Sequence, residues 1–416
     1  MKETSKKGWL ICFVAALFFS YELVQLHMLN ALSPHIMKEL SLNATELATL
    51  SSTYLLADVI FLIPAGLILD RFSVRKVILT ALGFCILGTI GFAFAQTLFQ
   101  ASVFHFFSGI GNAFCFLSCM MLAGNWFKEK STFVMSAMIT IGLLGGVIAQ
   151  VPFSLLAEAF SWRNALLIDG GIGLVIWGLN YAFVQDIQNR VRSEVSLTSF
   201  KTLFSQMKKA CQVPETWICG FYTGLMNLPL MIISAMVGNL FLVQVHGLSE
   251  TKASFVISMI SFGTIIGSTL FGWVSEKLKM KKGLMIAGAL SSLAIFTTLM
   301  LANFLTLATL VVLFFLIGLL SASQVLGYPM ITEAAPSDVK GTAMGVSALI
   351  IMGLAFVLQP VTGILLDLGH VANLPYNHAD FSRAFLLFPL AFLISVILSL
   401  FLKERRQEKK VAAFKA

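Results

Sequence analysis

Twelve long apolar runs, separated by short polar segments, are the feature that most constrains how this chain folds. A helix needs roughly 20 apolar residues to cross the hydrocarbon core of a bilayer. The runs, taken with the turn signals between them, predict helices over residues 9–32, 46–69, 76–97, 99–124, 132–158, 163–185, 216–243, 252–275, 283–302, 305–332, 341–367 and 382–402. The sequence therefore predicts an all-α membrane protein with twelve transmembrane helices.

The composition excludes the soluble classes of protein. Of the 416 residues, 58% are hydrophobic and 12% are charged, whereas soluble domains carry about 25% charged residues. Such a chain cannot cover a water-facing surface, which argues against a soluble enzyme, a nucleic-acid-binding domain or a disordered protein. The partners expected are therefore the lipid bilayer and a small molecule, with no nucleic acid.

The distribution of basic residues predicts the topology. With both termini placed in the cytoplasm, all but four of the 28 Lys and Arg residues fall on the cytoplasmic side. The four exceptions are Lys38, Arg163, Lys252 and Arg383. Cytoplasmic loops carry an excess of Lys and Arg in membrane proteins, so we expect both termini in the cytoplasm.

The chain divides into two similar halves. A polar stretch predicts a cytoplasmic linker loop at 186–213, between six-helix bundles at 1–185 and 214–416, the second ending in a basic cytoplasmic tail. The segments 66–76 and 272–282 share a glycine, an acid and three basic residues at a constant offset of 206 positions. This repeat indicates an internal duplication.

The first of these segments, Gly66-x-x-x-Asp70-Arg71-x-x-x-Arg75-Lys76, resembles the signature of the major facilitator superfamily. Further resemblance lies in Asn125-Trp126-Phe127, Ser161-Trp162-Arg163, Glu333-x-x-Pro336, Tyr21-Glu22 and Gln359-Pro360-x-x-Gly363. The resemblance implies two six-helix bundles that move a small solute by alternating access. It also implies a monomer in the bacterial cytoplasmic membrane.

The repeated segments predict a cytoplasmic gate. Gly66 would let a neighbouring helix approach closely, and Asp70 would lie near the start of the eleventh helix, where a carboxylate is favoured. Arg71 and Arg75 would pair with acids or helix-end carbonyls. The alternative is an ordinary basic cytoplasmic loop. The second copy predicts a weaker counterpart at Gly272, Glu276 and Lys281.

Two acidic residues fall in the middle of predicted helices. Glu22 and Asp58 have no Lys or Arg at the same depth, and a buried carboxylate without a cation favours its protonated form. We expect both to bind protons. The alternative is a protonated acid with no role in the mechanism. Gln25 follows Glu22 on the same helix face, and the resemblance places that helix along the cavity.

Other polar residues are weaker candidates for the cavity. His105 stands where the superfamily often has arginine, so it would pass protons instead of anchoring an anion, or simply pack. Tyr222, Asn227, Gln324 and Tyr328 would bind the solute or bridge helices. The resemblance places the sixth helix at the periphery of the fold, so we expect Asp169 to be structural.

The function expected from these features is secondary active transport. The sequence has no nucleotide-binding motif and no catalytic motif, so an intramembrane enzyme is a remote alternative and no cofactor is expected. Energy would come from a proton gradient or another ion gradient. Two acids without a cation favour uptake of a zwitterionic or cationic metabolite, such as an amino acid, a short peptide or an amine. The alternatives are an efflux antiporter for drugs or metabolites and an organic-anion symporter.

Overall fold

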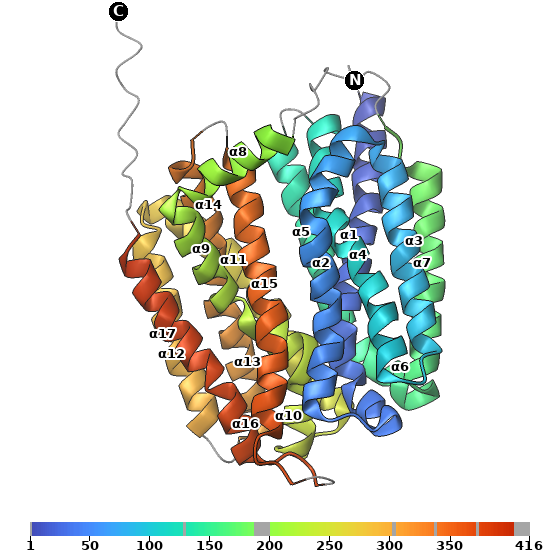
Figure 1. Ribbon diagram of the computed structural model, residues 1–416, viewed down its shortest axis with the longest axis vertical. Helices are drawn as coiled ribbons and strands as arrows, with labels where there is room; N and C mark the ends of the chain where they lie inside the picture. Colours follow the sequence, from blue (N-terminus) through green and yellow to red (C-terminus); the bar gives the residue numbers. More distant parts are fainter. Residues whose placement is uncertain are drawn as a thin grey trace, which may run out of the picture.

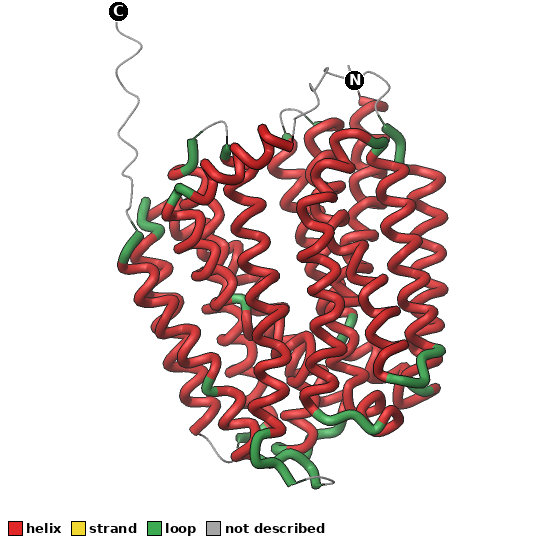
Figure 2. The backbone as a smooth tube through the Cα atoms, viewed as in Figure 1, coloured by secondary structure: helices red, strands yellow, loops and turns green. Residues whose placement is uncertain are grey.

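The computed structural model describes residues 2–127, 130–186, 200–301, 305–336, 339–371 and 374–402. Every regular element in these residues is a helix (Figure 2). The first half holds α1 (Lys2–Leu40), α2 (Ala44–Arg71), α3 (Val74–Ala93), α4 (Leu98–Trp126), α5 (Ser131–Ile148), α6 (Val151–Phe160) and α7 (Trp162–Phe183). The linker holds α8 (Phe200–Cys211).

The second half has more interruptions. It holds α9 (Pro214–Met226), the π-helix η1 (Pro229–Val237), α10 (Gly238–Gln244), α11 (Glu250–Leu278), α12 (Lys282–Leu301), α13 (Leu307–Ser321), the 3₁₀-helix η2 (Ala322–Leu326), α14 (Gly327–Ala334), α15 (Lys340–Asp367), α16 (His378–Phe385) and α17 (Leu387–Leu400). The described residues contain twelve helical segments long and apolar enough to cross a membrane, which confirms the predicted fold class.

Four of the twelve spans are broken, and the breaks follow the sequence. Pro152, Pro229, Pro329 and Pro389 lie at or near these breaks, and each removes one N–H donor from the helical hydrogen-bond ladder. Span five is divided into α5 and α6, span seven into α9, η1 and α10, span ten into α13, η2 and α14, and span twelve into α16 and α17. Irregular backbone inside a membrane is tolerated where protein surrounds it, and η1 is buried almost throughout.

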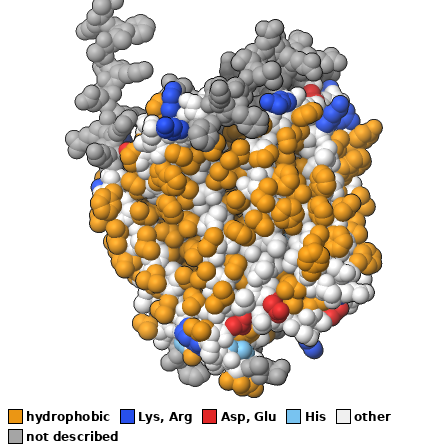
Figure 3. Space-filling view, viewed as in Figure 1, with side chains coloured by type: hydrophobic (Ala, Val, Ile, Leu, Met, Phe, Trp, Pro, Cys, Tyr) orange, Lys and Arg blue, Asp and Glu red, His pale blue; other side chains and the backbone are white. Residues whose placement is uncertain are grey.

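The two halves stand side by side, with α2 and α15 adjacent between them (Figure 1). We call the face at which α1 begins and α17 ends the terminal face, and the other the opposite face. On the side drawn in Figure 3, a broad hydrophobic band separates blue Lys and Arg side chains, gathered mostly at the terminal face, from a polar edge at the opposite face.

Polar bonds between the halves gather toward the opposite face. Asn30 on α1 donates from Nδ2 to Gln150 Oε1 (3.0 Å), and Gln150 Nε2 donates to the carbonyl of Ser234 in η1 (2.9 Å). The backbone N–H of Asn239 donates to Asn30 Oδ1 (3.0 Å). All four side chains are buried. Gln150 occupies the break between α5 and α6, so the break positions an amide that joins the halves.

Two local features differ from the sequence expectation. The first helix extends over Lys2–Leu40 instead of ending at residue 32, because Pro34 is accommodated within the helix. Part of the linker expected as a loop is the helix α8, which packs against α9 and α15.

Candidate functional site

A buried polar network joins α1, α3 and α7 in the first half. Gln25 Nε2 donates to Asp169 Oδ2 at 2.5 Å, and Thr89 Oγ1 donates to Gln25 Oε1 at 2.9 Å. The Tyr21 hydroxyl lies 3.4 Å from the Asp169 carbonyl oxygen. Gln25 is thus directed at α3 and α7, and Asp169 is its direct partner. Asp169 was predicted to be structural, although it is an acid inside a span without a cation, as Glu22 and Asp58 are.

Glu22 lies at the packed junction of α1, α2 and α4. Its side chain is fully buried, and Oε2 accepts a hydrogen bond from the Tyr54 hydroxyl (3.1 Å). Oε1 has no hydrogen-bond partner. A Cβ on Gly111 would stand 1.9 Å from Oε1, so only glycine leaves room for the carboxyl group. The sequence thus places an uncompensated carboxyl group in the core of the first half.

Asp58 is also buried, beside Asn112 on α4. In the described part of the chain, no Lys or Arg forms an ion pair with Glu22, Asp58 or Asp169. An ionised carboxylate buried without a cation is costly, and a proton on the group removes most of that cost. The first half therefore carries three carboxyl groups suited to holding protons.

His105 packs between two aromatic rings. Its ring centroid lies 5.3 Å from that of Tyr54 and 5.5 Å from that of Phe92. The side chain is buried, and Nδ1 has no hydrogen-bond partner. His105 thus contacts Tyr54, the residue that bonds Glu22, and its proposed role in proton transfer stays a prediction.

The four candidates in the second half do not form a single cluster. The Tyr222 hydroxyl donates to the Met285 carbonyl (2.8 Å) and lies 2.9 Å from Ser323 Oγ, so it is occupied within its own half. Gln324 Nε2 donates to Asn227 Oδ1 at 3.1 Å, where spans seven and ten are both irregular. Broken helices with their free backbone groups form binding sites in transporters. Tyr328 is half-buried on α14.

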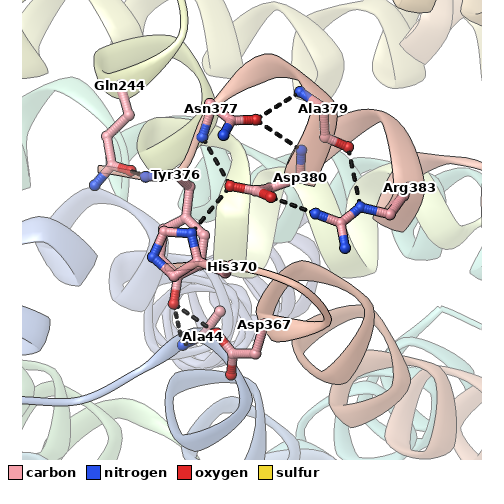
Figure 4. Close-up of polar contacts among 9 residues, drawn as sticks. All are labelled: Ala44, Gln244, Asp367, His370, Tyr376, Asn377, Ala379, Asp380 and Arg383. Atoms are coloured by element: carbon pink, nitrogen blue, oxygen red, sulfur yellow. Dashed lines mark hydrogen bonds and ion pairs between the residues drawn. The ribbon is translucent and has the colours of Figure 1, made fainter. Parts of the chain in front are cut away.

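A second set of polar contacts, missed by the sequence analysis, closes the opposite face (Figure 4). Asp367 at the end of α15 accepts hydrogen bonds from Thr45 N (2.8 Å), Thr45 Oγ1 (2.5 Å), Ala44 N (3.3 Å) and the Tyr376 hydroxyl (2.6 Å). Ala44 N also donates to the Tyr376 oxygen (2.9 Å). A carboxylate of the second half therefore caps the N-terminus of α2 in the first half. We call this set of residues the opposite-face gate.

The gate is supported by a loop with its own polar bonds. His370 stacks on Tyr376 with ring centroids 4.0 Å apart, and its Nδ1 lies 3.0 Å from Asp380 Oδ2. Arg383 donates to Asp380, and Tyr376 N donates to Gln244 Oε1 (2.7 Å). Burial and the adjoining Asp367 carboxylate raise the pKa of the Tyr376 hydroxyl. Tyr376 thus stays protonated in the physiological range and keeps donating to Asp367.

At the terminal face, the two glycines of the predicted gate have no close neighbours among the described residues. Nothing stands within 4 Å of a Cβ built on Gly66, Gly272 or Gly345. The close helix approach expected at Gly66 and Gly272 is therefore absent in this conformation. The side chain of Asp70 lies outside the described residues, and Arg71 and Glu276 are exposed.

Arg75 and Lys281 of these segments have partners within their own halves. Arg75 Nη2 donates to the Tyr181 carbonyl at 2.5 Å, with the guanidinium 5.0 Å from the Tyr181 ring centroid. Lys281 pairs with Glu333. A helix-end carbonyl was one of the partners expected for Arg75, and the gate function remains a prediction.

Replacing Arg75 by Ala is expected to favour opening of the terminal face and to slow transport. The lost contacts anchor the loop after α2 to α7, and helix-end electrostatics of this kind contribute about 0.3–2 kcal/mol. The rate at which maleimide labels Gly345→Cys should rise roughly 2- to 30-fold, as the free energy implies. Glu276→Gln should change less. Unchanged labelling together with normal transport would remove the gate assignment.

The arrangement of two six-helix halves around paired, interrupted spans defines a class of secondary transporter. The chain belongs to the Major Facilitator Superfamily, whose sequence profile matches residues 8–357 and 219–416. It is an integral, multi-pass membrane protein with twelve spans, and not an enzyme.

Two named transporters illustrate what the chain is similar to. Monocarboxylate transporter 12 of Xenopus laevis is 28% identical over 324 residues, which cover 70% of this chain and 65% of the frog protein. The probable galactarate/D-glucarate transporter GarP of Escherichia coli is 23% identical over 386 residues, which cover 83% of this chain and 86% of GarP.

Solved structures show the same fold. A bacterial homologue of the human lysosomal transporter Spinster aligns over 96% of this chain and 98% of its own, with a TM-score of 0.78 and 14% identity. The nucleoside transporter NupG also gives a TM-score of 0.78, over 95% of this chain and 99% of its own, at 12% identity.

Proposed function

We propose that the protein carries a small organic acid anion together with a proton across the bacterial cytoplasmic membrane. The observation that carries this proposal is the chemistry named for its relatives. A monocarboxylate transporter, galactarate/D-glucarate transporters and a D-galactonate transporter all align with more than half of the chain. Their named substrates share a carboxylate group.

This proposal replaces the zwitterionic or cationic solute favoured by the sequence analysis with one of its alternatives, the organic-anion symporter. The earlier preference depended on the absence of Lys and Arg inside the spans. A proton that travels with a carboxylate makes the pair neutral, so a fixed cation is not required for a monoanion to cross the protein. The missing basic residues then favour proton coupling and do not argue against an anion.

Buried proton-binding groups support the coupling. Glu22, Asp58 and Asp169 are all buried in the first half, where ionised carboxylates lack cationic partners.

The proposed topology puts the terminal face in the cytoplasm, because Lys and Arg concentrate there. The halves are bonded at the opposite face, so this conformation corresponds to one closed toward the outside. Alternating access requires that these bonds break once in each cycle.

The test is counterflow and gradient-driven uptake in proteoliposomes. Purified protein would be assayed with radiolabelled lactate, galactonate and galactarate, and in parallel with alanine, a dipeptide and putrescine. We expect counterflow of at least one acid, accumulation when the lumen is alkaline, and loss of accumulation with a protonophore. Protein-free liposomes are the control. Counterflow confined to the amino acid, the dipeptide or the amine would contradict the proposal.

A further inference from the structure

His27 on α1 is a buried histidine with an unused ring nitrogen. Its side chain is 2% exposed, and Nδ1 lies 2.9 Å from the carbonyl oxygen of Leu23. A carbonyl oxygen only accepts hydrogen bonds, so Nδ1 carries the hydrogen. In the neutral ring, Nε2 is then an acceptor only, and it has no partner among the described residues. Buried polar atoms are almost always hydrogen-bonded, so the unpartnered Nε2 is a candidate to bind a solute.

Ser261 on α11 supplies a second unused polar atom from the other half. Most Ser and Thr side chains on α11 donate to a carbonyl three or four residues earlier; these are Ser258, Thr264, Ser268, Thr269 and Ser275. The buried hydroxyl of Ser261 has no hydrogen-bond partner in the described part of the chain. It therefore differs from its neighbours in being free to bind something else.

Gly146 on α5 brings these two groups to one place. A Cβ on Gly146 would lie 3.4 Å from His27 Nδ1 and 3.5 Å from Ser261 Oγ. The position lies where α1 and α5 of the first half meet α11 of the second. The His27 ring faces this glycine through Nδ1 and Cε1, the carbon that joins Nδ1 to Nε2, and the Ser261 hydroxyl faces it from the other half. The missing side chain of Gly146 therefore leaves space beside the ring and the hydroxyl.

No charged side chain of the described residues forms a hydrogen bond or an ion pair with His27. The described acids on α1, α11 and the elements that pack against them bond elsewhere or are exposed: Glu22 bonds to Tyr54, Glu39 to Trp162 and Arg163, Glu46 to Asn43, Asp169 to Gln25, Glu250 to His35 and Glu158 to Thr251, while Asp58 lies beside Asn112 and Glu276 is exposed. The side chain of Asp70 lies outside the described residues. The imidazole interacts only with the Leu23 carbonyl. His27 is thus not neutralised by a carboxylate of the protein and is available to a carboxylate of a solute.

We infer that His27 Nε2 and Ser261 Oγ bind the carboxylate of the transported acid, and that His27 takes up the accompanying proton. This inference rests on the proposed function. A carboxylate only accepts hydrogen bonds, and so does Nε2 of the neutral ring. The anion therefore binds only when Nε2 is protonated, which turns it into a charged donor. Ser261 donates the second hydrogen bond. Anion and proton bind as a neutral pair, and the site is complete only while the two halves meet there.

The test measures anion affinity and proton uptake on purified protein in detergent. The probe is whichever of lactate, galactonate or galactarate shows the strongest counterflow, added in a weakly buffered solution above pH 7. The wild type should take up a proton with each bound anion. His27→Gln should bind the anion without taking up a proton, because its amide donates without titrating. His27→Ala should bind at least about tenfold more weakly, as expected for a lost hydrogen bond to a charged group.

Three further variants separate binding from folding. Ser261→Ala should weaken binding about tenfold and keep the proton uptake. Ser258→Ala is the matched control, because its hydroxyl bonds to Phe255 within the same helix, and it should leave both quantities unchanged. Gly146→Ala adds a methyl group at ordinary contact distance, so it should fold normally and still weaken binding.

The outcomes distinguish this inference from the proposed function. If the wild type binds an acid and the His27, Ser261 and Gly146 variants bind it with unchanged affinity and proton uptake, the inference is overturned and the proposed function stands. If the wild type binds none of the three acids, both are overturned. Monodisperse elution of each variant shows that a lost affinity is not a lost fold.

Discussion

Replacing Asp367 by Asn is expected to loosen the opposite-face gate and to expose the interface between the halves. The carboxylate accepts three hydrogen bonds from Ala44 and Thr45 at the N-terminus of α2 and one from Tyr376. An asparagine presents an NH₂ group to donors on one side and removes the charge that favours a helix N-terminus. A lost charge-assisted hydrogen bond costs about 1.5–3 kcal/mol. The ratio of open to closed molecules should rise roughly 10- to 100-fold.

The reporter is a cysteine introduced at Ser52, which is buried on α2. It lies on the same helix face as Ala48, whose Cβ faces Gly363 of α15. Labelling would use a membrane-impermeant maleimide in a background with Cys211 replaced by Ser, since the other five native cysteines are buried. Asp367→Asn should accelerate the labelling, and Tyr376→Phe should do so to a smaller extent.

Glu46→Gln is the matched control for this experiment. Glu46 belongs to the capping box at the same end of α2, where it accepts from Asn43 within the first half. Its loss should weaken the helix end without separating the halves. If Asp367→Asn labelled as slowly as the wild type while Glu46→Gln labelled faster, the bond between the halves would not be what holds this face closed. Because the pKa of Tyr376 is raised, its hydroxyl stays protonated as pH rises through the physiological range, and mild alkali should not open the gate.

The spans were predictable from sequence because their signal is local. Each apolar run is long enough to cross a membrane by itself, and all twelve occur as helices in the described residues. The breaks were not predicted, although prolines lie beside them; what the sequence could not show is the contact made at a break. The run 132–158 divides at Gln150, whose amide bonds both Asn30 and Ser234. Those partners are more than 80 positions away in the chain, and no local pattern reports them.

The contact at the opposite-face gate also joins residues that are far apart in the chain, and the sequence did not locate it. The sequence analysis predicted a carboxylate of one half at a helix N-terminus of the other half, and it placed that contact at Asp70 in the cytoplasm. The described contact of this kind joins Asp367 to α2 at the opposite face. Asp367 lies at the end of an apolar run, where an acidic residue is common and gives no functional signal. Two of its partners are the backbone N–H groups of Ala44 and Thr45, which every residue type except proline provides, so the sequence does not indicate them. His27 was not predicted as a site residue, because what distinguishes it is the absence of a hydrogen-bond partner for Nε2 among the described residues, which only the structure shows.

Glu22→Gln is expected to abolish accumulation driven by a pH gradient and to preserve exchange. Glutamine has nearly the volume of protonated glutamate, so Gly111 still leaves room for it and the Tyr54 hydroxyl still donates to its oxygen. What is lost is the capacity to bind and release a proton. Solute exchange needs no net proton movement, so counterflow should survive. Accumulation also needs a group that binds and releases a proton as the halves reorient, the step for which Glu22 is the candidate, so it should fail.

The same assay separates Glu22 from the other titratable groups. Asp58→Asn, Asp169→Asn and His105→Gln rank the remaining candidates of the first half, and Tyr54→Phe controls for the loss of the hydrogen bond without loss of the acid. Proton uptake on anion binding, which we assign to His27, should persist in Glu22→Gln. His27 would then be protonated when the anion binds, and Glu22 would be the group that binds and releases a proton as the halves reorient; both lie on α1. Full pH-driven accumulation in Glu22→Gln, together with its loss in His27→Gln, would instead assign the coupled proton to His27 alone.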